Sequence, residues 1–521
     1  MEQLHYPGNL PSVRRVAALG FFDGIHLGHR TVLRRALDVA GNALTPTVFT
    51  FDTLPKLQDG GRLLSREERD RRLSQMGFSE CIIADFVFLR NFSPEEFVKT
   101  VLVDALQVTA VCCGENFRFG KNGAGDVAAL KRWGDIFGFD VHILPLTPVD
   151  GEPVSSTRIR RALAAGDMLT VNRLLGHPYE ITATVVDGAH LGRTFGTPTI
   201  NQQLPVNTAY PPFGVYASAV EVDGTVHHAV TNIGIKPTVG GNTPLAETWI
   251  FDYRGNLYGQ TVTVRPVRFL RAEQTFASVE ELKAQIVADG EAARAVFAPT
   301  GRTRAILFDF DDTLQNRQEA FLNYSRAFIR HHFPARSAEE QEAAAQKMAK
   351  FNGSGYGFPS YSVFYRELIR LLDWQDAPDV EKLVRDSIVF FPEHTVLLPR
   401  VAEGLAALRE RGYIVGMITN GVPFMQNKKL DVSGVRSYFD LIIISGEEDV
   451  SKPHPEIFRR AAARLGVHPA DCVFVGDHPI NDIQGAVEAG MTPLFMQASG
   501  DFPTPDGVRV VHSMDELIAS V

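Results

Sequence analysis

The pattern of apolar residues changes twice along this chain of 521 residues, and these changes limit its possible folds. From residue 14 to about 165, short apolar runs alternate with amphipathic segments, which is typical of a parallel α/β sheet. Between residues 179 and 270, closely spaced strand-like runs and turns favour a small antiparallel barrel instead. A new apolar run at 305–310 begins a second α/β series. Because the chain is too long for one hydrophobic core, we expect three domains, at residues 1–178, 179–298 and 303–521.

Local signals place the main elements of these domains. Five apolar runs in the first domain predict strands, and Ser93, Pro94 and Glu96 form the pattern of a helix-capping box. In the second domain, Asp223-Gly224 predicts a hairpin with a type I′ turn, and Arg254-Gly255-Asn256 predicts another hairpin. A helix is expected at 278–297, and a helical stretch at 319–391 predicts a cap at about 315–395 in the third domain. The five runs are 16–22, 47–51, 81–86, 109–113 and 141–146.

Composition narrows the classes of partner and compartment. Apolar residues make up 45% and charged residues 22%, as in ordinary globular proteins, and the net charge of -9 argues against a nucleic-acid or anionic-membrane partner. The first residues lack a signal-peptide pattern, and no stretch contains eighteen consecutive apolar residues. Four cysteines without metal-ligand spacing are expected to be buried thiols in a reducing compartment, so we expect a cytoplasmic protein. They are Cys81, Cys112, Cys113 and Cys472.

The first candidate site lies in the glycine-rich segment 20–29, where the first strand gives way to a helix. This segment places His26 and His29 three residues apart. Imidazoles and the free amides of a helix start can stabilise phosphates, and glycine lets the backbone approach them closely. The alternative is a pair of surface histidines in a glycine-rich turn. The motif alone does not decide between the two.

Further motifs in the first domain identify a family. The segment 154–160 opens a helix with two serines and two arginines, and segments 114–121 and 125–126 precede it. Together, residues 1–178 resemble the FAD synthetase half of bacterial bifunctional riboflavin kinase/FAD synthetases, with a Rossmann-like nucleotidyltransferase fold. The resemblance implies ATP-phosphate contacts from His26 and His29, a position near the flavin or metal for Asn116, and nucleotide contacts from Ser155, Ser156 and Arg160, with Arg158 as a weaker candidate.

One departure from that family lies after the second predicted strand. The family usually has a Pro-His-Pro turn there, whereas this chain has Thr53-Leu54-Pro55 and lacks a histidine on the phosphate side. FMN adenylylation is the expected activity. The alternative is a degraded or different nucleotidyltransferase.

The second candidate site lies in the predicted barrel. Thr199 and Asn201 are two residues apart in an extended segment, so both project from one face and can ligate magnesium with nucleotide phosphates. A turn-stabilising pair is the alternative for them, and a solvated strand charge is the alternative for Glu247. Residues 176–292 are similar to the riboflavin kinase half of the same family. The similarity implies Glu247 as the catalytic base and Gly192, Thr199 and Asn201 as nucleotide or magnesium contacts.

The third candidate site follows the strand at 305–308. The motif Asp309-Phe-Asp-Asp-Thr313 and three later motifs, at 418–421, 452–453 and 475–482, come at ends of strands or at a helix start. In an open α/β sheet, the carboxyl ends of parallel strands collect such residues at one edge. The order and spacing over 304–521 resemble the haloacid dehalogenase (HAD) superfamily, with a Rossmann-like fold and a helical cap.

This resemblance implies a phosphatase mechanism. Asp309 is expected to attack phosphorus, and Asp311 to protonate the leaving alcohol and then activate water. Because a dehalogenase does not need this second carboxyl group, Asp311 favours phosphate-ester hydrolysis. The remaining roles are phosphate binding by Thr419, Asn420 and Lys452, and Mg²⁺ binding by Asp309, the Asp311 carbonyl and Asp477, supported by Asp482.

The three sites together predict flavin-cofactor synthesis with an attached phosphatase. The expected substrates are riboflavin, FMN, ATP and a phosphorylated small metabolite, with Mg²⁺ as the metal. The gene fusion suggests the phosphorylated ribitylaminouracil precursor of riboflavin as that metabolite, which is a hypothesis. Two alternatives stay open: a kinase and phosphatase beside a degraded or different nucleotidyltransferase module, or a third module that only senses a phosphate ligand.

Overall fold

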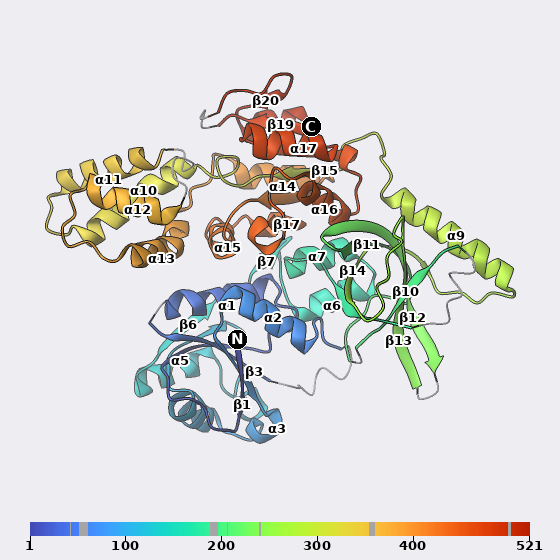
Figure 1. Ribbon diagram of the computed structural model, residues 1–521. Helices are drawn as coiled ribbons and strands as arrows, with labels where there is room; N and C mark the ends of the chain where they lie inside the picture. The colour runs from blue at the N-terminus through green and yellow to red at the C-terminus, as the bar shows by residue number, and fades with distance from the viewer. Residues whose placement is uncertain are drawn as a thin grey trace. The chain divides into compact units, whose positions relative to one another are not determined.

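The computed structural model describes residues 1–41, 43–51, 61–187, 196–205, 207–238, 241–353, 360–498 and 502–521. These residues form two compact units (Figure 1). The first unit comprises residues 1–222 and 227–296, and the second comprises 223–226 and 297–521. In the described part of the chain, no helix is both long enough and apolar enough to span a membrane.

The first unit begins with a six-stranded parallel sheet. Its strands are β1 (Glu2–Tyr6), β2 (Arg15–Leu19), β3 (Thr45–Phe51), β4 (Glu80–Ala84), β5 (Val108–Gly114) and β6 (Asp140–Leu144). Their order is β1-β4-β3-β2-β5-β6, and all neighbours are parallel. The five expected strands are present, with ends shifted by a few residues. The edge strand β1 was not predicted, because its exposed polar residues hide the apolar pattern.

Helices cover both faces of this sheet, and apolar clusters on each face form its core. The predicted capping box is confirmed, because Ser93 Oγ accepts from Glu96 N at 3.2 Å and Glu96 Oε2 accepts from Ser93 N at 2.7 Å. The helices are α1 (Leu27–Ala40), α2 (Arg66–Met76), α3 (Phe86–Leu89), α4 (Pro94–Glu96), its continuation η2 (Phe97–Ala105), α5 (Val127–Phe137), α6 (Ser156–Ala164) and α7 (Met168–Leu175).

The strand order creates a topological switch point beside β2. The chain passes from β2 to β3 and β4 on one side of the sheet, and then returns to β5 and β6 on the other. The carboxyl ends of β2 and β5 therefore flank the place where ligands bind in open α/β sheets.

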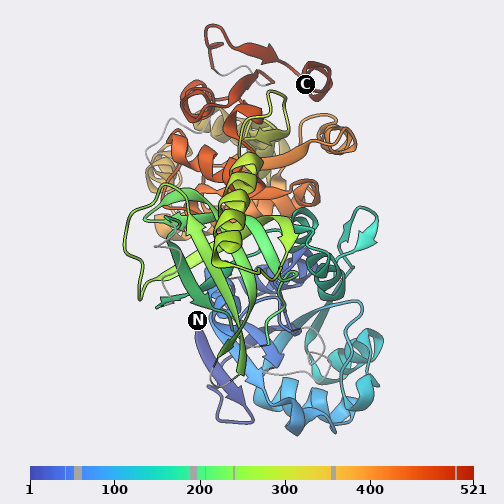
Figure 2. The same cartoon turned by 90° about the vertical axis from the view of Figure 1, so that its right-hand side faces the viewer.

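The rest of the first unit is a closed six-stranded barrel, as expected. Its strands are β9 (Ile181–Val186), β10 (Thr199–Gln203), β11 (Gly214–Val222), β12 (Thr225–Thr238), β13 (Gly241–Ile250) and β14 (Thr261–Ala272). They close in the order β10-β13-β12-β11-β14-β9. Helix α9 (Val279–Val296) packs across the barrel, close to the position predicted for it (Figure 2).

One predicted hairpin is correct and the other is wrong. At the tip of β11 and β12, Asp223 and Gly224 have φ values of 47° and 75°, as a type I′ turn requires. The prediction at 254–256 is wrong, because β13 pairs with β10 and β12, whereas β14 pairs with β9 and β11. That segment crosses between strands that are not neighbours, since barrel closure decides which strands pair.

The second unit is built on another six-stranded parallel sheet. Its strands are β15 (Ala305–Phe308), β16 (Ile414–Thr419), β17 (Leu441–Ile444), β18 (Cys472–Gly476), β19 (Thr492–Met496) and β20 (Arg509–Val511). The order β17-β16-β15-β18-β19-β20 places the switch point between β15 and β18. The helices packed around this sheet include α14 (Val401–Glu410), α15 (Pro423–Val432), α16 (Pro455–Leu465), α17 (Gly485–Ala489) and α18 (Met514–Ser520).

A helical insertion follows β15, where the apolar periodicity predicts it. Figure 1 shows its four helices gathered in one cluster. An apolar core of its own, which includes Phe321, Tyr324, Phe328 and Tyr365, holds the cluster together. The helices are α10 (Arg317–His332), α11 (Ala338–Asn352), α12 (Tyr361–Leu371) and α13 (Val380–Phe390).

The cysteines are buried and free, as the sequence predicts. Burial raises the pKa of each thiol, to about 11 for Cys81 and to about 12 for Cys112, Cys113 and Cys472. Protonated buried thiols are inert packing groups.

Candidate active sites

The loop after β2 brings two histidines together at the start of α1. His26 is the N-cap residue, and its Nδ1 accepts from the backbone N of His29 at 3.3 Å. The two rings stack with centroids 3.6 Å apart. The loop turns sharply, with φ values of 54° at Phe22, 86° at Gly24 and 40° at Ile25. Left-handed backbone at non-glycine residues is strained, and such strain is concentrated at functional sites.

Both histidines are held in the neutral form. Burial lowers the pKa of His26 to about 3. Burial and the neighbouring His26 place the pKa of His29 well below its ordinary value. A neutral imidazole can still donate one N–H to a phosphate oxygen. The motif can therefore bind an anion through hydrogen bonds, without a histidine charge.

The second predicted motif of this domain meets the first one at Asp23. Arg160 forms an ion pair with the buried Asp23 carboxylate and donates through Nε to the Gly61 carbonyl at 3.0 Å. Ser156 Oγ donates to the Asp23 carbonyl at 3.1 Å. Burial raises the pKa of Asp23, and Arg160 opposes this shift. The sequence did not single out Asp23, although an acidic residue inside a glycine-rich phosphate motif is a signal for such a partner.

The other predicted residues of this site are more spread out. Asn116 follows β5 on the far side of the switch point, and its side chain is exposed. Ser155 caps α6 by accepting from Arg158 N at 3.2 Å. Arg158 braces a turn by donating to the carbonyls of Val149 and Glu152 at 2.9 and 2.8 Å. The segment Thr53-Leu54-Pro55 lies outside the described residues.

A third buried histidine, His177, is expected to make the stability of this unit depend on pH. The ring of His177 contacts the Gly24 carbonyl at 3.1 Å and the Pro178 carbonyl at 2.9 Å. Burial lowers the pKa of His177 to about 3. The unfolded chain therefore binds more protons between about pH 6.5 and pH 3, and stability falls as the pH falls through that window.

We expect His177→Gln to weaken this pH dependence. The loss of stability below pH 6.5 should decrease by up to about 1.4 kcal/mol per pH unit, because one titrating group is removed. Urea unfolding of the full chain at pH 7 and pH 5 measures the effect. The matched control is His5→Gln, at an exposed position in β1. An unchanged pH dependence in His177→Gln would contradict the prediction.

The barrel site is defined by strand register. Asn201 on β10 lies opposite Glu247 on β13, and Glu247 lies opposite Asn232 on β12. Thr199 lies opposite Trp249 in the same ladder. Directly opposite residues project from the same face of a sheet. The predicted Thr199, Asn201 and Glu247 therefore share one face.

The other face of these strands points into the barrel. Gln202, one residue after Asn201, is fully buried and donates to the carbonyls of Ala183 and Val262 at 2.7 and 2.8 Å. The face with Glu247 is therefore the outer one, since side chains alternate along a strand. The sequence did not assign a role to Asn232, and Gly192 lies outside the described residues.

In the second unit, three buried carboxylates meet at the carboxyl edge of the sheet. Asp309 follows β15, and Asp477 and Asp482 follow β18. Each offers an oxygen to a group whose atoms all lie within 4.8 Å of one another. Burial, together with repulsion from neighbouring carboxylates, raises the pKa of Asp309 and Asp477. A dication bound by oxygen ligands would offset this repulsion, so the donor set fits Mg²⁺.

Lys452 joins this cluster from the loop before α16. Its Nζ donates to Asp309 Oδ1 at 2.5 Å and to Asp482 Oδ1 at 2.6 Å. Asn420 fixes the Lys452 backbone, because its Nδ2 donates to the Lys452 carbonyl at 2.9 Å and its Oδ1 accepts from Lys452 N at 3.0 Å. Four loops from distant parts of the sequence thus converge here, as the motif positions predict.

Asp311 is held by residues that the sequence motifs did not reveal. Lys429 Nζ donates to both carboxylate oxygens, at 2.7 and 2.9 Å. Gln426 Nε2 donates to Oδ2 at 2.9 Å, and Gln315 Nε2 donates to Oδ1 at 2.5 Å. Burial alone would raise the pKa of Asp311, but Lys429 and the neighbouring donors hold it below its ordinary value. One signal could have revealed two of these residues. Gln426 and Lys429 are polar, buried and three positions apart on α15, directly after the Thr419 motif.

Comparisons with known proteins match the three regions that contain these sites to three family models. Sequence models match FAD synthetase at residues 11–158, riboflavin kinase at 175–297 and haloacid dehalogenase-like hydrolase at 303–490. The bifunctional riboflavin kinase/FMN adenylyltransferase of Listeria monocytogenes is 34% identical over 307 residues, which cover 57% of this chain and 97% of the relative. This chain belongs to the bifunctional riboflavin kinase/FMN adenylyltransferase family.

Two other matches cover a similar share of the chain. The family member from Pseudomonas fluorescens is 38% identical over 292 residues, which cover 55% of this chain and 94% of the relative. A solved structure described as a macrolide-efflux protein from Streptococcus pneumoniae is 31% identical, with a TM-score of 0.50. The match covers 56% of this chain and 99% of the chain in that structure. In this chain, the hydrolase match follows the two flavin-family matches in the sequence.

The two flavin-family regions are tied together inside the first unit. Arg62 N donates to the Asn207 carbonyl, and Ala209 N donates to the Arg62 carbonyl, both at 2.7 Å. Tyr179 Oη donates to the Ala209 carbonyl at 2.8 Å. Next to Arg62, Leu63 N donates to the Asp23 carboxylate at 2.8 Å. Backbone pairing thus links the adenylyltransferase-like loop to the segment that precedes the first long strand of the kinase-like barrel.

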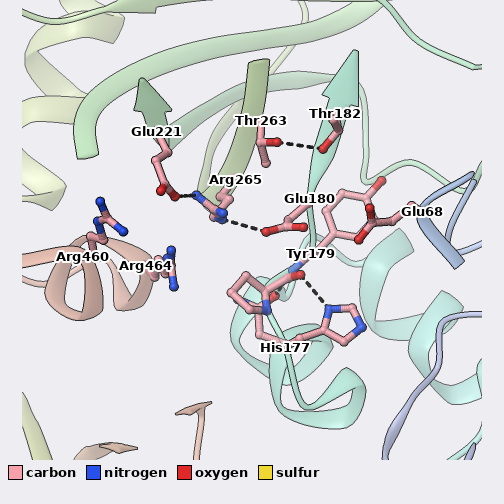
Figure 3. Close-up of polar contacts among 12 residues, drawn as sticks. Glu68, His177, Tyr179, Glu180, Thr182, Glu221, Thr263, Arg265, Arg460 and Arg464 are labelled. Atoms are coloured by element: carbon pink, nitrogen blue, oxygen red, sulfur yellow. Dashed lines mark hydrogen bonds and ion pairs between the residues drawn. The ribbon is translucent and has the colours of Figure 1, made fainter. Parts of the chain in front are cut away.

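An ion-pair chain reinforces this link. Arg72 of α2 contacts Glu180 at 2.8 Å, and Arg265 of β14 contacts the same carboxylate at 2.9 Å. Figure 3 shows Arg265 between Glu180 and Glu221, which lies 3.0 Å away on β11. The charges alternate along this row, so each ion is compensated where it is partly removed from water.

Proposed function

We propose that this protein phosphorylates riboflavin to FMN, adenylylates FMN to FAD, and hydrolyses a phosphate monoester in a third active site. The observation that carries the proposal is membership of the bifunctional family, with almost the whole length of its relatives covered. The buried carboxylate cluster in the hydrolase region supports the third activity. ATP use and four free buried thiols support a cytoplasmic location.

In the kinase reaction, Glu247 accepts the proton of the ribityl hydroxyl group as that oxygen attacks the γ-phosphorus of ATP. Thr199 and Asn201, with Gly192, would hold the nucleotide phosphates and Mg²⁺. Phosphoryl transfer depends mainly on positioning and on charge stabilisation. The cross-strand placement of Glu247 opposite Asn201 supports this division of roles.

In the adenylylation reaction, the FMN phosphate attacks the α-phosphorus of ATP and pyrophosphate leaves. The neutral His26 and His29 donate hydrogen bonds to the ATP phosphates, beside the amino end of α1. Ser155, Ser156 and Arg160 hold the nucleotide, and Asn116 faces the flavin or metal end. Asp23 supports Arg160 through their ion pair.

In the hydrolase reaction, Asp309 attacks phosphorus and forms an aspartyl-phosphate, which water then hydrolyses. Lys452, Thr419 and Asn420 hold the phosphate group. Asp311 donates a proton to the leaving alcohol and later accepts one from water. Asp309, Asp477 and the Asp311 carbonyl, with Asp482 in support, would hold Mg²⁺, which would supply charge stabilisation.

A time course with the full protein, riboflavin, ATP and Mg²⁺ tests the two flavin activities. Chromatography should show riboflavin converted to FMN and then to FAD. Accumulation of FMN without FAD would contradict the adenylyltransferase assignment and favour the alternative of an inactive first module. Release of phosphate from p-nitrophenyl phosphate and from a panel of alkyl phosphates tests the hydrolase.

We expect Arg160→Gln to slow FAD formation from FMN at least about tenfold, because the substitution leaves the buried Asp23 carboxylate without its cation next to the ATP phosphates. Riboflavin phosphorylation should be unaffected. Initial rates of both reactions measure the effect. The matched control is Arg161→Gln, since the neighbouring Arg161 side chain is 76% exposed. A similar loss in both variants would refute the role of Arg160.

A further inference from the structure

We propose that Lys429 and Gln426 of α15 are positioning residues that orient the Asp311 carboxyl group for the proton transfers of the hydrolase. This inference rests on the proposed phosphatase function. It concerns residues outside the four motifs that identify the hydrolase family. They lie on a helix that begins two residues after Gly421, the last residue of the Thr419 motif.

The contacts of Lys429 restrict the Asp311 carboxyl group most strongly. One ammonium group bonds both carboxylate oxygens, and Gln315 bonds Oδ1 as well. The Lys429 side chain is 5% exposed, and its Nζ lies 5.4 Å from the ring centroid of Phe391 in the helical insertion. A buried ammonium between a carboxylate and an aromatic face has little freedom to move. Lys429 therefore fixes both oxygens of the proposed acid/base.

Gln426 connects this carboxyl group to the phosphate-binding loop. Its Nε2 lies 2.9 Å from Asp311 Oδ2, 2.8 Å from Thr419 Oγ1 and 2.8 Å from the Asn420 carbonyl. An amide NH₂ has two hydrogens, so it cannot donate fully to three acceptors. Its Oε1 is buried and has no hydrogen-bond partner among the described residues. Gln426 thus sets the position of Asp311 relative to the Thr419 hydroxyl, which we assign to a phosphate oxygen.

The proton transfers explain why this orientation matters. In the first step, the Asp309–phosphorus bond forms, the ester P–O bond breaks, and the leaving oxygen takes the proton of Asp311. In the second step, the water oxygen bonds to phosphorus, the Asp309–phosphorus bond breaks, and Asp311 takes a proton from that water. A protonated carboxyl group still has an acceptor oxygen for Lys429, so the contact can persist through both steps.

Leaving groups of different basicity test this role. An alkoxide needs a proton as it leaves, whereas p-nitrophenolate is stable without one. The ratio kcat/KM reports the first step, because formation of the aspartyl-phosphate precedes its hydrolysis. We expect Lys429→Met to lower kcat/KM for glycerol phosphate about 100-fold and kcat/KM for p-nitrophenyl phosphate only about threefold.

Neighbouring residues provide the controls. Lys428 is also buried on α15, but its Nζ donates to the Val389 carbonyl at 3.0 Å and to Glu393 at 2.9 Å. Lys428→Met should therefore change both substrates equally. Lys429→Arg, which keeps the charge, should restore part of the selective loss. Gln426→Met should show the same selectivity and tests the proposal even if Lys429→Met does not fold.

Each outcome separates this inference from the proposed function. If the wild-type protein hydrolyses neither ester, the proposed phosphatase function fails. If the wild type and Lys428→Met hydrolyse both esters, but Lys429→Met and Gln426→Met slow them equally, only the positioning role is overturned. A selective loss of alkyl-phosphate hydrolysis in both variants supports it.

Discussion

Phosphatase turnover is expected to fall at least about 1000-fold in Asp309→Asn, because an amide cannot form the aspartyl-phosphate. Formation of FMN and FAD should be unchanged, since those sites lie in the first unit. The substitution also removes one buried carboxylate from a repelling cluster, so the free energy of unfolding should not decrease. Phosphate release, flavin chromatography and urea unfolding of the same preparation measure these three effects.

Asp471→Asn is the matched control for this experiment. Asp471 is as deeply buried as Asp309, but it lies at the amino end of β18, where it accepts from Thr300 N and Oγ1 at 2.9 Å. Its substitution should affect stability and leave turnover in place. Unchanged turnover in Asp309→Asn would mean that Asp309 is not the nucleophile, whereas a wild-type protein without phosphatase turnover would favour a third module that only binds a phosphate ligand.

Riboflavin kinase activity is expected to fall about 100-fold or more in Glu247→Gln, because glutamine cannot accept the hydroxyl proton. The side chain keeps its size and its place between Asn201 and Asn232, so nucleotide binding should persist. FAD formation from added FMN should be unchanged. Initial rates with riboflavin and with FMN as separate substrates measure the two effects.

The control for the kinase lies in the same barrel. Asp252, whose side chain is 81% exposed, pairs with Arg294 and has a φ of 59°, which asparagine also tolerates. Asp252→Asn should therefore leave both flavin reactions unchanged. If Glu247→Gln retains full kinase activity, the base is another residue or the reaction needs none.

The third site was predictable because its residues follow parallel strands that are neighbours in the sheet. Asp309, Thr419 and Asp477 each come at the end of an apolar run, and parallel strands bring such ends to one edge. The Lys429 contact was not predictable in this way. It joins two positions 118 residues apart through a helix face, and only tertiary packing decides which side chain of that helix reaches Asp311.

The errors in the fold have similar physical causes. The turn signal at Arg254-Gly255-Asn256 is a true local preference, but a local preference cannot determine the partner of a strand in a closed barrel. β1 is an edge strand, and several of its polar side chains are exposed. Its sequence therefore contains no apolar run that would mark it as a strand. Predicting that Asn201 and Glu247 share one face requires the register between β10 and β13. These two residues are 46 positions apart in the chain, so the local sequence does not reveal this register.

The pairing of Arg62 with residues 207–209 has a consequence for protein engineering. The boundary between the two flavin-family matches falls near residue 175, yet excision there would separate Arg62 from its backbone partners Asn207 and Ala209. An isolated kinase fragment would present unpaired backbone groups to solvent, which promotes association between copies. Dissection of the two flavin activities by point substitution is therefore preferable to truncation.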